Sequence, residues 1–205
     1  MTSICAIETD RGVVMGGDSL ISYADDLSFV FPSEVEKVWR TNSTVMGVAG
    51  SCRILQVFKH YLVIPDLDRD EELIEDWMVH DCVDAMRRAL KQAGNGNGDD
   101  PWTALLGIGS MLWMIDGGFG VHRCSDGLMA CGSGSPYLMG SLYTTSQFNI
   151  AAEELGTLDP ISPTVRIHFA LASAARYSSG SMEPFIIYDN YPWLQLYKGE
   201  PDADQ

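Results

Sequence analysis

The sequence predicts an α+β fold in which two sheets lie face to face, with helices outside both. The chain has 205 residues, a length at which roughly 70% of the unfolded surface is buried on folding, so it can form one large core. Its hydrophobic fraction of 46% and charged fraction of 20% are those of a globular protein. The predicted elements come in runs of strands, helices and strands again, which favours layered packing over alternating βαβ units. We expect a single domain over residues 1–205, with a polar tail from about residue 198.

The first fifty residues predict strands. Apolar residues alternate over residues 3–8, and a turn at 9–12 leads into an apolar run over 13–17, the pattern of a β-hairpin. A looser stretch extends to Pro32, and two further strands are expected at 35–39 and 44–50.

Two helices and a loop follow. Ser51 is suited to cap a helix whose apolar residues recur at helical spacing over 54–62. A second helix begins in the acidic residues 70–72, which suit the positive end of a helix dipole, and continues to about residue 91. The glycine- and asparagine-rich residues 94–101 predict a flexible loop within the same domain.

The second half repeats the order of strands, helices and strands. Glycine turns separate apolar runs that predict strands at 103–108, 111–115 and 120–123. Helical patterns follow over 136–142, 148–155 and 164–177, and the last strands are expected at 184–188 and 193–197.

Charge and cysteine content exclude several classes of function. Thirteen Lys and Arg against 28 Asp and Glu give a net charge of −15, which disfavours binding to nucleic acid or to anionic membranes. No apolar run is long enough to cross a membrane, and the N-terminus lacks the features of a signal peptide. Five cysteines without a C-x-x-C pair and four histidines without ligand spacing predict a cytoplasmic protein with no metal and no cofactor.

The residues that could carry chemistry are Thr2, Asp18, Lys37, Gly50 and Ser133. Removal of Met1, which precedes a small residue, would leave Thr2 with a hydroxyl and a free α-amine. Because an α-amine titrates near pH 8, nucleophile and general base can reside in one residue. A nearby lysine would lower the pKa of the hydroxyl, an aspartate would keep that lysine charged, and a backbone amide in a small-residue turn would hold the oxyanion. Taken singly, each residue also has an ordinary structural role in a turn, a solvated strand or a helix start.

These residues stand in the order of a known family. The segment from Thr2 to Asp18, sixteen positions later, resembles the opening of proteasome β-type subunits and of the bacterial peptidase HslV. Residues 36–40 resemble the family's strand with the active-site lysine, which assigns Lys37. Residues 45–51 resemble its oxyanion turn, which assigns Gly50, and residues 132–137 its Gly-Ser-Gly motif, which assigns Ser133.

The resemblance implies a four-layer αββα sandwich of two antiparallel sheets flanked by helices, the fold of N-terminal-nucleophile (Ntn) hydrolases. It further implies a threonine-type endopeptidase that cleaves unfolded polypeptides inside a homo-oligomeric ring or double ring. Because the sequence has no Gly-x-x-x-x-Gly-Lys-[Ser/Thr] loop, an ATP-dependent unfoldase would be a separate partner.

The sequence departs from the family at two places, and the longer loop together with the unusual tail suggests a divergent bacterial or viral member. The segment between Asp18 and Lys37 is longer than in HslV. Ser178 matches a late serine of proteasome subunits, but Ala175 stands where those subunits carry an aspartate.

Two other functions remain open at this point. A non-catalytic ring or scaffold subunit would keep the fold without the chemistry. An Ntn amidase acting on small amides is the third possibility, although such enzymes more often use cysteine or serine and arise by autocleavage of a longer precursor, whereas one residue precedes Thr2 here.

Overall fold

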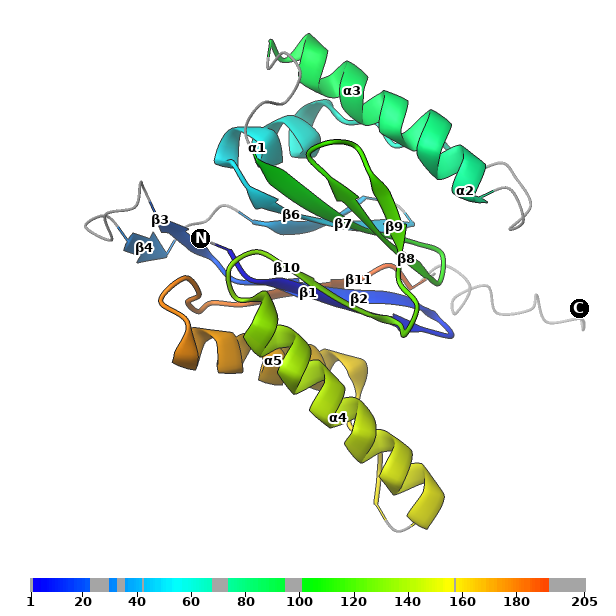
Figure 1. Cartoon of the computed structure of the whole chain (residues 1–205), viewed down its shortest axis with the longest axis vertical. Coiled ribbons are helices and arrows are strands. Elements are labelled where there is room, and N and C mark those ends of the chain that lie inside the picture. The colour runs from blue at the N-terminus through cyan, green and yellow to red at the C-terminus, as the bar shows by residue number, and fades with distance from the viewer. Residues whose placement is uncertain are drawn as a thin grey trace, which may run out of the picture.

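The chain folds into the expected four-layer αββα sandwich (Figure 1). The computed structural model describes residues 2–22, 30–32, 36–41, 43–67, 74–94, 101–156 and 158–191. Within this part of the chain, two antiparallel sheets form the inner layers. A layer of helices covers the outer face of each sheet (Figure 1).

The first sheet carries both ends of the described chain. Its strands follow the order β10-β1-β2-β11 and are all antiparallel: β1 (Ile4–Thr9), β2 (Gly12–Gly17), β10 (Leu128–Cys131) and β11 (Ile186–Asp189). The β1–β2 hairpin that the alternation predicts is confirmed, with Ile4 opposite Gly17 and Thr9 opposite Gly12.

The second sheet is built from consecutive hairpins in the order β5-β6-β7-β8-β9. Its strands are β5 (Val38–Thr41), β6 (Thr44–Gly50), β7 (Trp102–Ile108), β8 (Met111–Asp116) and β9 (Val121–Arg123). A separate small hairpin, β3 (Leu20–Ser22) with β4 (Val30–Pro32), leaves the first sheet just after β2.

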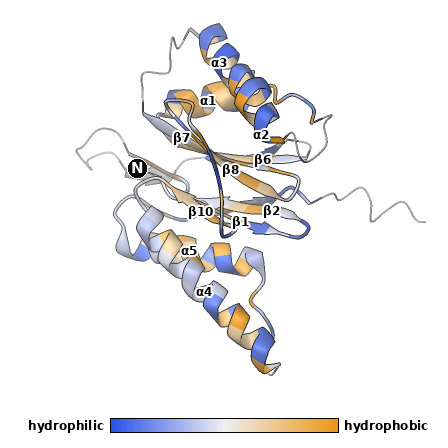
Figure 2. Ribbon diagram, turned by 45° about the vertical axis from the view of Figure 1, so that its right-hand side comes forward, coloured by the Kyte–Doolittle hydropathy of each residue, from blue (hydrophilic) through white to orange (hydrophobic). Residues whose placement is uncertain are grey.

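Each outer layer of helices buries an apolar face against one sheet (Figure 2). The five-stranded sheet is covered by α1 (Cys52–Tyr61), α2 (Ile74–Trp77), the π-helical turn η2 (Met78–Cys82) and α3 (Val83–Gln92). The four-stranded sheet is covered by α4 (Ser135–Leu155) and α5 (Pro163–Tyr177). Between the sheets lies a third apolar cluster that includes Ile4, Met15, Val38 and Leu105.

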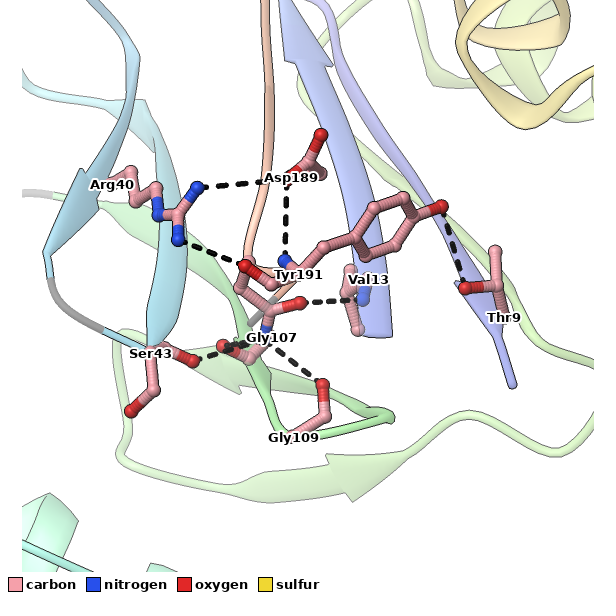
Figure 3. Close-up of polar contacts among 9 residues, drawn as sticks. Thr9, Val13, Arg40, Ser43, Gly107, Gly109, Asp189 and Tyr191 are labelled. Atoms are coloured by element: carbon pink, nitrogen blue, oxygen red, sulfur yellow. Dashed lines mark hydrogen bonds and ion pairs between the residues drawn. The ribbon is translucent and has the colours of Figure 1, made fainter. Parts of the chain in front are cut away.

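Asn190, which follows β11, links the two sheets through hydrogen bonds of its side chain. Its side-chain amide donates to the carbonyl oxygens of Ser43, Gly107 and Gly109 at 3.0, 3.3 and 2.9 Å, and its Oδ1 accepts from the Val13 amide at 2.7 Å (Figure 3). Val13 belongs to one sheet, Gly107 to a strand of the other, and Ser43 and Gly109 to turns between strands of that other sheet, so one buried side chain links both sheets.

Two predicted elements differ in the structure. Residues 136–142 and 148–155 were expected as separate helices, but α4 is one helix of 21 residues. The hydroxyls of Thr144, Thr145 and Ser146, which lie between the two predicted helices, bond back to carbonyls one turn earlier and so find partners inside the helix. The strand β10 was not predicted.

Other predictions fall partly outside the described residues. These are the acidic start of the second helix at 70–72, most of the loop 94–101, the strand 193–197 and the tail after residue 198. All five cysteines are free, four of them buried, and Cys52 is exposed. Among the described residues, no helix has the length and apolar character needed to span a membrane.

Candidate active site

A buried ion pair lies at one end of the sandwich. Lys37 Nζ is 2.9 Å from Asp18 Oδ1, and these residues are 4% and 1% exposed. The same carboxylate accepts the backbone N–H of Ser3 at 2.7 Å and, through Oδ2, that of Leu20 at 3.0 Å. Three donors thus converge on Asp18, which fixes the lysine against the first residues of the chain.

Two opposing effects act on the pKa of Lys37. Burial lowers this pKa because the charged form loses its hydration, and this is the larger effect. The Asp18 carboxylate opposes the decrease through its charge and its hydrogen bond, and Cys52, at the start of α1, adds a smaller effect in the same direction. The net result is a lysine that loses its proton more readily than an exposed one.

Thr2 lies immediately before β1 and is buried, with 7% of its surface exposed. Its backbone nitrogen donates to Ser133 Oγ at 3.4 Å, and the Ser133 hydroxyl lies 3.5 Å from the Thr2 carbonyl oxygen. The Gly134 amide donates to that same carbonyl at 3.3 Å. The Gly-Ser-Gly segment therefore holds the backbone of Thr2 from both sides.

Glycine is required on either side of Ser133. Gly132 has φ +87°, and a Cβ there would lie 2.1 Å from the Thr2 carbonyl oxygen. A Cβ at Gly134 would lie 1.9 Å from Ser3 Oγ. The chain can approach Thr2 this closely only because these two positions lack side chains.

Gly50 closes β6 at the same end of the molecule. It pairs with Trp102, has φ +116°, and a Cβ there would lie 2.3 Å from the Pro101 carbonyl oxygen. Ser51 then caps α1, as predicted, by accepting the Arg53 amide at 3.3 Å. β6 lies beside the strand that follows Lys37, since the Val48 amide donates to the Lys37 carbonyl at 3.0 Å.

The hydrogen bonds of Ser178 are made within α5 and the turn that follows it. Ser178 ends α5, where its amide donates to the Ala174 carbonyl and its hydroxyl accepts the Gly180 amide at 3.2 Å. The turn that follows reaches the site because the Met182 carbonyl accepts the Ser19 amide at 3.3 Å. Ala175 lies within α5 and brings no carboxylate to this region.

The sequence reasoning missed three buried serines around these groups. Ser3, Ser19 and Ser181 are 0%, 0% and 6% exposed, and their hydroxyls have no hydrogen-bond partner among the described residues. Ser3 follows Thr2, Ser19 follows Asp18, and Ser181 comes three residues after Ser178. This closeness in sequence to the predicted site residues is the signal that could have identified them. Within the described ranges, no group of three or more His, Cys, Asp or Glu side chains is placed to hold a metal ion.

Comparison with solved structures finds several proteins with a similar fold. HslV from Trypanosoma brucei superimposes with a TM-score of 0.61 at 18% identity, over 91% of this chain and 98% of HslV. The protein has the fold of HslV. BPH from Thiobacillus denitrificans matches with a TM-score of 0.63 at 19% identity, over 93% and 99% of the two chains. Anbu (ancestral beta-subunit) from Yersinia bercovieri matches with a TM-score of 0.61 at 14% identity, over 93% and 81%.

At the level of sequence, no protein-family model and no curated protein matches this chain. The HslV-like fold agrees with the αββα sandwich that the resemblance implied.

Proposed function

We propose that this protein is an N-terminal threonine peptidase that cleaves unfolded polypeptides, with Thr2 as nucleophile once Met1 has been removed. The observation that carries the proposal is the buried Asp18–Lys37 pair, whose carboxylate also binds the amide of Ser3, the residue next to Thr2. A strand end that only had to pack would not need a desolvated lysine there, because burial of a charged pair is costly.

The chemistry follows from the free amine. Thr2 Oγ1 attacks the peptide carbonyl carbon while its proton passes to the Thr2 amine, and the charge that develops on the carbonyl oxygen is held by the Gly50 amide. The protonated amine then gives its proton to the departing amine of the substrate, which leaves an ester on Thr2. A water molecule, deprotonated by the same amine, hydrolyses that ester and restores the hydroxyl.

The other residues position and polarise these groups. The Lys37 ammonium favours the negative charge that develops on the Thr2 oxygen, and Asp18 keeps the lysine charged and in place. Ser133 and Ser178 position the Thr2 amine or the attacking water. The contact between the Thr2 nitrogen and Ser133 Oγ supports this role for Ser133.

The proposed enzyme works as a homo-oligomeric ring or double ring whose chamber admits unfolded chains. The likeness to HslV, BPH and Anbu (ancestral beta-subunit) supports assembly of this kind. A separate ATP-dependent unfoldase would deliver substrates, and both proteins would reside in the cytoplasm.

The test combines intact mass with a substrate and a probe. We expect the purified protein to have lost Met1 and to cleave a fluorogenic peptide, with at least a 10³-fold lower rate in Thr2→Ala and the same oligomeric mass. A structure of Thiobacillus denitrificans BPH, which has this fold, contains epoxomicin, so we use this compound as probe. It should add its mass to the wild type and leave Thr2→Ala unmodified.

Ala175 favours a second candidate, a non-catalytic ring subunit, because it removes a carboxylate that the resemblance leads one to expect. A Met1-free protein that assembles but neither cleaves peptide nor reacts with epoxomicin would establish this candidate instead. Turnover that persists in Thr2→Ala would contradict both.

A further inference from the structure

A cleft of about 200 Å³ opens on the helix-covered face of the five-stranded sheet. Its floor is apolar and includes Trp39, Met46 and Phe58, and its rim includes Val63 and Asp66. Thr44 and Ile108 also line it, and this pair marks the end of β6 and β7 opposite to the Gly50–Trp102 pair. The cleft is therefore separate from the candidate active site.

The rim of the cleft exposes apolar side chains to water. Val63 and Leu67 on its rim are 81% and 37% exposed, which leaves apolar surface in contact with water. An apolar occupant would remove this rim surface from water.

The described chain ends beside this cleft. The Asn190 side chain donates to the Ser43 carbonyl at 3.0 Å, and Arg40 Nη2 donates to the Tyr191 carbonyl at 3.0 Å (Figure 3). Ser43 itself lines the cleft, as does Thr41, the residue after Arg40. The last two described residues, Asn190 and Tyr191, are thus each anchored to a position on or next to the rim.

The sequence continues from this point with Pro192 and then Trp-Leu-Gln-Leu-Tyr over residues 193–197. Six residues beyond Tyr191 can span up to about 20 Å when extended, so this apolar segment is long enough to enter the neighbouring cleft. A segment tethered this closely has an effective concentration in the millimolar range, which gives it an advantage over a segment from another molecule.

We propose that residues 193–197 of the same chain dock into this cleft. In an extended conformation, Leu194 and Leu196 would project to the same side of the segment, so both can then enter the apolar floor. The acidic residues that follow, Glu200, Asp202 and Asp204, then remain outside in water. The cleft takes a peptide of this chemistry: two leucines spaced by one residue, in extended conformation.

The first test is disulfide trapping in the full chain. Thr41→Cys and Leu194→Cys are combined in a Cys52→Ser background, which removes the exposed native thiol. Mild oxidation should give an intramolecular disulfide, mapped by mass spectrometry of the non-reduced peptides. The matched control pairs Leu194→Cys with Tyr143→Cys, because Tyr143 is exposed on α4 in the opposite helix layer. A yield no higher than the control, or a disulfide that joins two chains, would overturn the proposal.

The second test measures occupancy by competition. A labelled peptide of residues 192–205 should bind the full-length Leu194→Asp/Leu196→Asp variant at least tenfold more tightly than it binds the wild type, because the variant's own tail no longer fills the cleft. Adding Val63→Asp on the rim should weaken that binding at least tenfold. Val79→Asp, 43% exposed on η2 and outside the cleft lining, should leave it unchanged. Equal binding to wild type and variant, or indifference to Val63→Asp, would contradict docking here.

Discussion

Lys37 and Lys59 form ion pairs of similar length in very different surroundings. Lys37 lies 2.9 Å from Asp18 in the interior, and Lys59 lies 2.7 Å from Glu36 with about 30% of each side chain exposed. We expect Lys37→Met to lower the free energy of unfolding by about 3–5 kcal/mol, since it leaves a buried carboxylate without its cation. Lys59→Met should cost less than about 1 kcal/mol, because water replaces the partner. Urea denaturation of both variants measures the difference.

Coupling within the buried pair gives a second measure of the same interaction. Combining Lys37→Met with Asp18→Asn should cost at least 1 kcal/mol less than the sum of the two single changes, as found for residues in direct contact. Costs that simply add would show that the two charges do not depend on each other. Peptide cleavage should be lost in all three variants, because the Thr2 oxygen loses its electrostatic support.

The lowered pKa of Lys37 predicts opposite trends in stability and activity at alkaline pH. Between the folded-state pKa and the unfolded value of about 10.4, the unfolded chain binds more protons, so the free energy of unfolding should rise with pH. In the same window the folded protein loses the ammonium, so the cleavage rate should fall. Initial rates and urea unfolding from pH 7 to 10.5 test this. Lys37→Met should lack the rise in stability; a rate that stays constant up to the ordinary lysine range would contradict the assigned role.

At the scale of an element, α4 and the segment before it contain two glycines with opposite requirements. A Cβ at Gly134 would lie 1.9 Å from Ser3 Oγ, whereas a Cβ at Gly140 meets nothing within 4 Å. Gly140→Ala should stabilise the protein by about 0.5–1 kcal/mol, because alanine is the better helix former. Gly134→Ala should destabilise it and slow peptide cleavage, since Ser3 must move away from its place beside Thr2. Thermal unfolding of the pair measures the contrast, and equal shifts would contradict the close approach.

The elements that the sequence predicted are those whose pattern is local. Alternation identified the β1–β2 hairpin, and the Ser51 cap identified the start of α1. β10 was not predicted, because the short segment Leu128–Cys131 becomes a strand only by pairing with β1, more than a hundred residues away in the sequence. The prediction of two helices in place of α4 was wrong because the polar middle of this helix carries no apolar period, although it continues the same helix.

The candidate site also has a part that the sequence predicts and a part that it does not. Residue types in order were enough to select Thr2, Asp18, Lys37 and Ser133, and the structure joins Asp18 to Lys37 and Thr2 to Ser133 directly. The hydrogen bonds from the backbone N–H groups of Ser3 and Leu20 to the Asp18 carboxylate could not be predicted, because every residue except proline has such a group and only the fold decides which one points inward.

At the scale of the whole molecule, charge and apolar surface are unevenly distributed. The chain carries a net charge of −15, yet residues 135–152 of α4 include no Asp, Glu, Lys or Arg. Tyr143 on α4 and Phe169 on α5 are 60% and 48% exposed, and a groove between these helices is lined by Tyr137, Ser141 and Phe169. Two copies of an acidic protein repel each other least where neither presents a charge, so this face suits contact with a second copy.

If the proposed assembly uses the α4–α5 face, it should respond both to a new charge and to salt. We expect Tyr143→Asp and Phe169→Asp each to shift sedimentation toward smaller species, because a carboxylate would be buried against an apolar neighbour. Val79→Asp, on the opposite helix layer and 43% exposed, serves as the control and should leave the distribution unchanged. Raising NaCl from about 50 mM to about 0.5 M should favour the larger species, since it screens repulsion between subunits while the apolar contact persists. An assembly indifferent to Tyr143→Asp and Phe169→Asp would place the contact on another face.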